Sequence, residues 1–244
     1  MTVALGYTRP MGSQWKQKHR LAAADARGRL FGRLAKEIAI AARNGADPDM
    51  NATLRMAIDA ARKQSMPRDT LERAIKKGAG IGQDAVTYEL VTYEGFAPHQ
   101  VPVIVECLTD NRNRTATNIR VHFNKGGGQL GSSGAVAWDF DRRGIVAALP
   151  PEAGDDADEA AIECGADDLQ PGDEGATHFL TDPAELSEVA GALEGRGWQI
   201  ESAKLGWISK SPKALEGEAL AEVEAFLERL DGDDDVQEIY VGLG

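Results

Sequence analysis

Residues 101–108 have the sequence VPVIVECL, a near-continuous apolar run in a chain of 244 residues. Just upstream, residues 87–93 (TYELVTY) alternate loosely between polar and apolar side chains and are rich in β-branched and aromatic types. Pro98 lies between the two segments and is typical of a turn. Short runs of this composition, bounded by turn residues, predict strands. We therefore predict two strands joined by a turn around Pro98.

A helical pattern precedes these strands. Apolar residues at every third or fourth position predict helices over 21–43, 51–64 and 67–78. The apolar stripe of the first helix consists of Leu30, Leu34 and Ile38. Because the loops between the helices are short, we expect a small bundle, with an extended arm ahead of it over 13–20.

The elements after residue 108 distinguish between fold classes. Periodicity predicts helices over 114–124, 157–164, 183–193 and 218–230, and strands over 135–140, 145–149, 177–180 and 236–241 and within 198–208. The first two of these strands are expected to pair across 141–144. Few connections are long enough for repeated βαβ crossovers, so the sequence favours α+β units over a doubly wound parallel sheet.

The net charge of −12 is distributed very unevenly. Residues 1–80 carry 16 Lys and Arg against 7 Asp and Glu, which is a net charge of +9. Residues 81–133 are nearly neutral at −1, and residues 134–244 have a net charge of −20. Such a difference between segments indicates separate charged modules, and the acidic total does not exclude a nucleic-acid partner.

The basic module contains most of the candidate nucleic-acid contacts. In residues 15–20 (WKQKHR) an aromatic ring for base stacking adjoins cations for phosphate. Helical spacing places a cationic row opposite the apolar stripe of the first helix, and a second cluster ends the third helix. The candidates are Trp15, Lys16, Lys18, His19, Arg20, Arg29, Arg33, Lys36, Arg43, Arg73, Lys76 and Lys77. The alternatives are a solvated polar face, or a face that docks on the chain's own acidic region.

Two further cations lie at a predicted strand-to-helix junction. In residues 110–114 (DNRNR), Asp110 or Asn113 is expected to cap the following helix. Arg112 and Arg114 are expected either to reach phosphate or to pair with Asp110 and Glu106, and the sequence leaves both roles open.

Residues 124–134 (NKGGGQLGSSG) form a glycine-rich segment. Its glycines match a dinucleotide-binding string, but that fingerprint requires a strand before it and a helix after it, and here a helix precedes and a strand follows. A long structural turn is the favoured interpretation. The alternative is a flexible loop that brings Lys125 close to a phosphate backbone.

The sequence contains no recognisable catalytic or metal-binding pattern. The four histidines lack HExxH or HxH spacing, and neither a P-loop nor a G-x-S-x-G elbow occurs. We therefore expect no metal, no cofactor and no enzyme, and keep a hydrolase or nucleotide-dependent enzyme only as a third functional alternative.

Other patterns concern location and partners. The sequence has two isolated cysteines, and neither a signal peptide nor an apolar run of about 20 residues is recognised in it. These features favour a cytoplasmic protein without membrane contact. The acidic stretches 155–163 and 231–235 are expected to be solvated surface, or to bind a basic protein partner.

Four stretches resemble the YebC/PmpR family of probable transcriptional regulatory proteins. They are residues 15–20, 75–78 (IKKG), 105–115 (VECLTDNRNRT) and 123–136 with its triple glycine. The resemblance implies an N-terminal three-helix bundle and two α+β domains with partial ferredoxin-like character. It also implies that the C-terminal helix and strand return to the middle domain, which gives domains over 1–80, over 81–133 with 212–244, and over 134–211. Residues 1–10 have no family counterpart, so Met11 is the expected native N-terminus.

The resemblance implies two functions. One is transcriptional regulation by binding promoter DNA. The other is that of a translation factor or translational activator bound to the ribosome and its RNA, as for mitochondrial relatives. The positive charge of residues 1–80 supports a nucleic-acid contact, and no clear recognition-helix motif for base edges is present. Both targets therefore remain open at this point.

Overall fold

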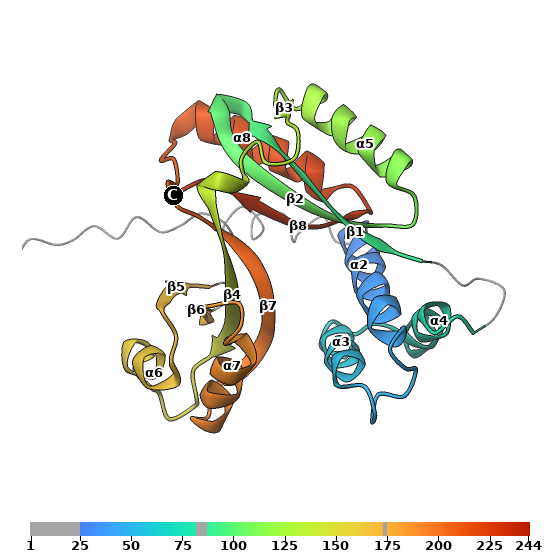
Figure 1. The fold of residues 1–244 in the computed structure, drawn as a ribbon, viewed down its shortest axis with the longest axis vertical. Helices are drawn as coiled ribbons and strands as arrows, with labels where there is room; N and C mark the ends of the chain where they lie inside the picture. The colour runs from blue at the N-terminus through green and yellow to red at the C-terminus, as the bar shows by residue number, and fades with distance from the viewer. Residues whose placement is uncertain (1–24, 82–86, 173–174) are drawn as a thin grey trace, which may run out of the picture.

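The structure is a computed structural model, which describes residues 25–81, 87–172 and 175–244. It contains an N-terminal helical bundle and two four-stranded antiparallel sheets, each accompanied by helices (Figure 1). This is the α+β class that the order of elements predicted. The expected arm over 13–20 lies outside the described residues.

The bundle consists of α2 (Asp25–Ala42), α3 (Ala52–Lys63) and α4 (Arg68–Gly78), in agreement with the three predicted helices. Asn51 caps α3 by accepting from Leu54 N at 3.1 Å, and its amide donates to Ala41 O at 2.7 Å. This one side chain therefore fixes the start of α3 to the end of α2. The helices α2 and α4 approach closely, because a Cβ on Gly78 would lie only 1.9 Å from Ala39 O. The buried core of the bundle includes Leu34, Ile38, Leu54, Ile58, Ala61, Met66 and Leu71.

The first sheet has the strand order β3-β1-β2-β8. Its strands are β1 (Glu89–Ala97), β2 (Val101–Thr109), β3 (Gln129–Leu130) and β8 (Val236–Val241), with the short turn η1 (Pro98–Gln100) between β1 and β2. The helices α5 (Arg112–Lys125) and α8 (Gly217–Asp231) lie on one face. Phe123 and Phe226 meet there edge to face with ring centroids 5.1 Å apart. The C-terminal helix and strand thus complete a sheet that begins near residue 89.

The second sheet has the order β5-β6-β4-β7. Its strands are β4 (Phe140–Leu149), β5 (Asp168–Pro171), β6 (Thr177–Thr181) and β7 (Gln199–Ser209). The helices α6 (Ala157–Cys164) and α7 (Leu186–Gly195) cover one face, where Phe179 packs edge to face on Trp198. The short strand β5 was not predicted.

The predicted strand over 135–140 is wrong. Residues 137–139 form the 3-10 turn η2 (Ala137–Asp139), and β4 runs unbroken through the expected hairpin turn. The cause is Glu94, a buried residue on β1 whose carboxylate accepts from the backbone N–H groups of Gly134, Val136 and Ala137 at 2.7–3.0 Å. Burial disfavours ionisation of Glu94, but these three donors outweigh it and lower its pKa below the ordinary value. A carboxylate that accepts from three N–H groups within four residues holds this segment in a turn.

The glycine-rich segment is a structural turn, as the favoured interpretation predicted. A Cβ on either Gly126 or Gly128 would lie 2.6 Å from the ring of Phe226, so both positions require glycine. The turn is also fixed to β1 by a hydrogen bond from Gly131 N to Glu94 O at 2.8 Å. A side chain at either position would displace α8 from the sheet.

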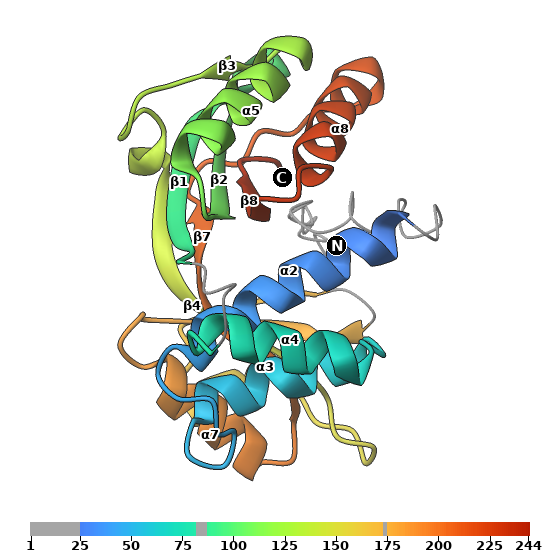
Figure 2. The same ribbon diagram turned by 90° about the vertical axis from the view of Figure 1, so that its right-hand side faces the viewer.

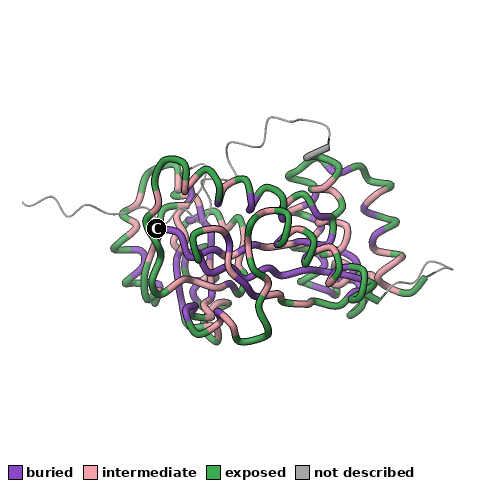
Figure 3. The backbone as a smooth tube through the Cα atoms, turned by 90° about the horizontal axis from the view of Figure 1, so that it is seen from above, coloured by how far each residue is buried: buried purple, intermediate pink, exposed green. Residues whose placement is uncertain are grey.

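Burial in the first sheet is greatest in its second strand. Every residue of β2 is buried, whereas much of the outer backbone is exposed (Figure 3). A central strand covered on both faces explains why the VPVIVECL run lacks alternation.

Candidate nucleic-acid interface

The helix α2 lies beside the first sheet (Figure 2), and Arg33 and Lys36 of its cationic row contact residues 108 and 231–235. Arg33 donates to the Asp231 carboxylate at 2.9 Å and to its backbone oxygen at 2.5 Å. Lys36 donates to Asp235 Oδ1 at 2.7 Å and to the backbone oxygens of Asp234 and Leu108 at 2.7 and 3.0 Å. Residues 231–235, termed the acidic loop, therefore cover this part of the helix.

The expectation that this row faces outward is wrong for Arg33 and Lys36. Their side chains are only 18% and 14% exposed, because the acidic loop lies against them. The alternative in which the face docks on the chain's own acidic region is the one observed. Arg29 is half-buried and has no acceptor among the described residues.

Asp235 connects the bundle to the middle of the molecule. Besides Lys36, it accepts from Arg114 Nη2 at 2.8 Å and from Thr115 Oγ1 at 2.7 Å, and its side chain is 5% exposed. Burial raises the pKa of this carboxyl, but the hydrogen bonds from Lys36, Arg114 and Thr115 outweigh burial and lower the pKa to about 2. Asp235 is therefore ionised throughout the physiological pH range and holds two helices together.

Tyr88, directly before β1, makes further contacts with the bundle. Its backbone oxygen accepts from Arg43 at 2.6 Å, and its hydroxyl accepts from Lys77 at 2.8 Å. The Nζ atoms of Lys77 and Lys36 also lie 5.2 and 5.9 Å from the centre of its ring, within cation–π range. The candidate cations Arg43 and Lys77 are thus engaged within the chain.

The two arginines at the start of α5 differ. Arg114 pairs with Asp110 at 2.9 Å and with Asp235, so the internal pairing expected for it is found with Asp110. Arg112 is exposed and lies 3.8 Å from Glu89.

Two details of the expectation at this junction are wrong. The cap of α5 is Asn111, which accepts from Arg114 N at 3.1 Å, because its backbone is extended immediately before the first helical turn. Glu106 instead accepts from Arg142 at 2.9 Å and Trp207 Nε1 at 3.0 Å, since its strand faces the second sheet there.

Several exposed cations of the bundle lie on α3 and α4, which are on the side of α2 away from the first sheet (Figure 2). Of the predicted candidates, Arg73 contacts only its own helix and Lys76 has no acceptor among the described residues. Sequence reasoning missed Arg55 and Lys63 on the outer face of α3, which are exposed and equally without acceptors among the residues described. They lie opposite the buried Leu54, Ile58 and Ala61, so the amphipathic pattern of α3 contains the signal.

Another exposed cation lies at the end of α5. Lys125 is exposed in the last turn and has no acceptor among the described residues. The neighbouring Arg120 is also exposed. The predicted candidates Trp15, Lys16, Lys18, His19 and Arg20 lie outside the described residues.

In the described part of the chain, His99 and His122 are paired with carboxylates. His99 Nε2 lies 2.7 Å from Glu222, and His122 Nε2 lies 3.1 Å from Asp233. Within residues 25–81, 87–172 and 175–244, no group of three His, Cys, Asp or Glu side chains is arranged to hold a metal ion.

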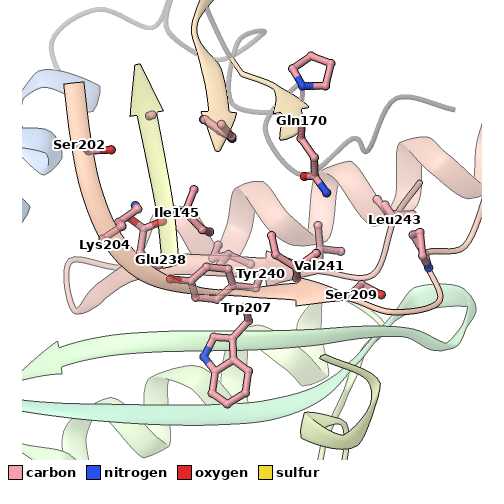
Figure 4. A pocket seen from close by; sticks show the side chains of 16 residues that line it. Ile145, Gln170, Ser202, Lys204, Trp207, Ser209, Glu238, Tyr240, Val241 and Leu243 are labelled. Carbon is pink, nitrogen blue, oxygen red and sulfur yellow. The ribbon is translucent and has the colours of Figure 1, made fainter. Parts of the chain in front are cut away.

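A pocket of about 320 Å³ lies where the edge strands β7 and β8 meet (Figure 4). Its walls include Tyr240 and Trp207, and Lys204 and Glu238 form an ion pair at one end (Figure 4). Gly206 allows the strands to approach, because a Cβ there would lie 2.4 Å from Ile145 and 3.2 Å from the Tyr240 ring. The pocket therefore belongs to the packing between the two sheets.

The fold and the site define a class of multidomain α+β protein. In this class a basic helical bundle is joined to two antiparallel sheets, and exposed cations lie on the outer helices of the bundle. Two family models match the chain, the TACO1/YebC N-terminal domain over residues 13–81 and the TACO1/YebC second and third domain over residues 88–243. The chain belongs to the TACO1/YebC family.

Similar proteins span the whole chain. A "probable transcriptional regulatory protein" of Pseudomonas syringae pv. tomato is 60% identical over 234 residues, covering 96% of this chain and 99% of the relative. One from a Polaromonas species is 58% identical over 237 residues, with 96% and 99% covered. The crystal structure of a conserved hypothetical protein from Aquifex aeolicus matches with a TM-score of 0.78 at 42% identity, covering 89% of this chain and 90% of that one. Among the described helices, none is long and apolar enough to cross a membrane.

Proposed function

We propose that this protein is a cytoplasmic regulator of gene expression that binds nucleic acid through its helical bundle, acting on transcription by binding DNA. The observation that carries the proposal is the set of exposed cations Arg55, Lys63, Arg73 and Lys76 on α3 and α4. The name shared by relatives up to 60% identical supports a role in transcription.

The arrangement of charge supports contact with the phosphate backbone. On α3 and α4 the acidic residues Asp59 and Glu72 pair with Arg62 and Arg68, so the remaining cations are spaced singly over the surface. Singly spaced cations neutralise phosphates, and base-specific contacts require side chains aligned toward a groove. The acidic charge lies mostly beyond residue 134, which directs a polyanion to the bundle.

The second candidate function is binding to the ribosome and its RNA as a translation factor. The same observation favours it, because backbone contacts suit folded RNA as well as duplex DNA. The segment Trp15–Arg20 is proposed to add stacking and phosphate contacts in either case.

We also propose the domain division over 1–80, over 81–133 with 212–244, and over 134–211. The pairing of β8 with β2 and the separate apolar core of the second sheet support it. In this division the acidic third domain, with α6 and α7, is free for a basic protein partner.

The test measures binding of the full chain to duplex DNA by fluorescence anisotropy and to ribosomes by sedimentation, over a salt series. Arg55→Gln, Lys63→Gln and Lys76→Gln should each weaken binding and reduce the slope of log K against log salt by about 1 where they contact phosphate. The matched control is Arg229→Gln, an exposed cation on α8 that should leave the slope unchanged. Binding to neither target would reject the proposal, and binding only to ribosomes would select the second function.

A further inference from the structure

The contact between α2 and the acidic loop resembles a complex of cations with an anionic ligand. Arg33 and Lys36 donate hydrogen bonds to five oxygens from outside the bundle. Two of these are carboxylate oxygens of Asp231 and Asp235. All five lie 2.5–3.0 Å from a guanidinium or ammonium nitrogen. Guanidinium and ammonium groups donate hydrogen bonds to phosphate oxygens in the same way.

The fit of Arg33 to the acidic loop is incomplete. Its Nε–H is buried and has no hydrogen-bond partner among the described residues, although the guanidinium is held through Nη2. A buried donor without an acceptor is costly, and carboxylates and phosphates commonly engage a guanidinium through two parallel N–H bonds. The loop therefore leaves free one of the donors that a bidentate anion would use.

The described contacts between the bundle and the first sheet are mainly polar. Among the described residues, their apolar cluster consists of Ala39, Tyr88 and Leu108 with the half-buried Ile40, whereas the bundle and the sheet each have a larger core of their own. An interface that is not large and apolar allows relative movement of the two units. Separation at this surface would leave both cores intact.

We propose that the acidic loop Asp231–Asp235 occupies a second phosphate-binding surface on α2, and that nucleic acid displaces the loop to reach Arg33 and Lys36. The two residues lie three positions apart on α2, about 4.5 Å along its axis, and share one face of the helix. The proposal rests on the proposed function, since it assumes that the bundle binds nucleic acid at its outer helices first. It adds that the acidic loop and the nucleic acid compete for the same cations of α2.

The loop offers a matched pair of variants. Asp231 binds Arg33 through its carboxylate, whereas the exposed Asp234 contacts α2 only through its backbone oxygen. Asp231→Asn and Asp234→Asn remove the same charge from the same loop, and neither carboxylate is part of the apolar core. Asp235 is avoided because it also binds Arg114 and Thr115.

The experiment titrates duplex DNA and ribosomal RNA into full-length wild type, D231N, D234N and the double variant R33Q/D231N at two salt concentrations. D231N should bind about three- to tenfold more tightly than wild type, as expected for loss of one partly buried competing ion pair. D234N should change affinity by less than about twofold, and R33Q/D231N should lose the gain.

The outcomes separate the two proposals. Equal affinities for D231N and D234N, with wild type binding, would overturn the competition and leave the proposed function standing. The competition would also be overturned if R33Q/D231N bound nucleic acid as tightly as D231N. Binding by D231N alone would support the competition, and absence of binding by every variant would overturn both proposals.

Discussion

Glu106 on β2 and Arg142 on β4 join the two sheets, with Arg142 Nη1 lying 2.9 Å from Glu106 Oε1. The same oxygen accepts from Trp207 Nε1 at 3.0 Å, and the Arg142 guanidinium lies 4.8 Å from the centre of the Trp207 ring. A carboxylate on the first sheet thus organises an arginine and an indole on the second. This group joins the sheets together with the Lys204–Glu238 ion pair and the apolar cluster around Ile104 and Phe140.

Replacing Glu106 by Gln should destabilise the protein. The carboxylate is 10% exposed, and its loss leaves Arg142 as a partly buried charge without a counter-ion, which costs about 1–3 kcal/mol. Urea unfolding followed by tryptophan fluorescence measures the free energy of unfolding. The control is Asp167→Asn, which removes the half-exposed partner of Arg143 and should cost less than about 1 kcal/mol. An equal loss of unfolding free energy in the two variants would show that the Glu106–Arg142 pair contributes no more than the Asp167–Arg143 pair.

Asp235 should make the free energy of unfolding depend on pH in the acidic range. Its pKa is lowered from 3.8 to about 2 in the folded chain, so its contribution is complete above pH 4 to 5 and is lost as pH falls toward 2. A shift of that size corresponds to roughly 2 kcal/mol for this buried carboxyl. In Asp235→Asn the free energy of unfolding should fall less steeply between pH 5 and pH 2, whereas Asp234→Asn should keep the wild-type slope. An unchanged slope in D235N would contradict the role given to Lys36 and Arg114.

Gly128→Ala should be strongly destabilising. The added Cβ would lie 2.6 Å from the Phe226 ring and 2.7 Å from Phe96 O, and the backbone oxygen has no room to move. We expect a loss of at least about 2 kcal/mol in the free energy of unfolding, measured by thermal or urea denaturation. The control is Gly191→Ala in α7, where nothing lies within 4 Å of the added Cβ. That variant should gain about 0.5–1 kcal/mol, because alanine favours helix.

The two thiols should be unreactive in the folded protein. Cys107 is fully buried and Cys164 is 9% exposed, and burial raises the pKa of both thiols above the ordinary value. Since the thiolate is the reactive form, Ellman's reagent at pH 8 should label neither cysteine until denaturant is added. Rapid labelling of Cys107 in native buffer would show that the first sheet opens locally.

Local pattern predicted most of the elements. The helix over 157–164 and the strand over 236–241 begin and end where the sequence predicts, because their apolar periodicity agrees with the face that they bury. The strand over 135–140 failed for a tertiary reason, since the carboxylate that holds it in a turn comes from Glu94, about forty residues earlier. No local pattern contains that information.

The candidate site could be predicted only in part. A helical wheel distinguishes the apolar side of α2 from its polar side, but it does not show whether another part of the chain covers the polar side. For Arg33 the covering residue is Asp231, 198 positions away. By contrast, the exposure of Arg55 and Lys63 follows from the wheel of α3 alone, because nothing described covers that face.

The position of β8 has a consequence for synthesis on the ribosome. The strand that pairs with β2, and the acidic loop just before it, are translated long after β2 and α2. Until they emerge, the nascent chain carries β2 as an unpaired edge of apolar residues, Arg33 lacks Asp231 and Lys36 lacks Asp235. The first sheet is therefore completed, and this part of α2 covered, only after residues 231–241 have left the ribosome.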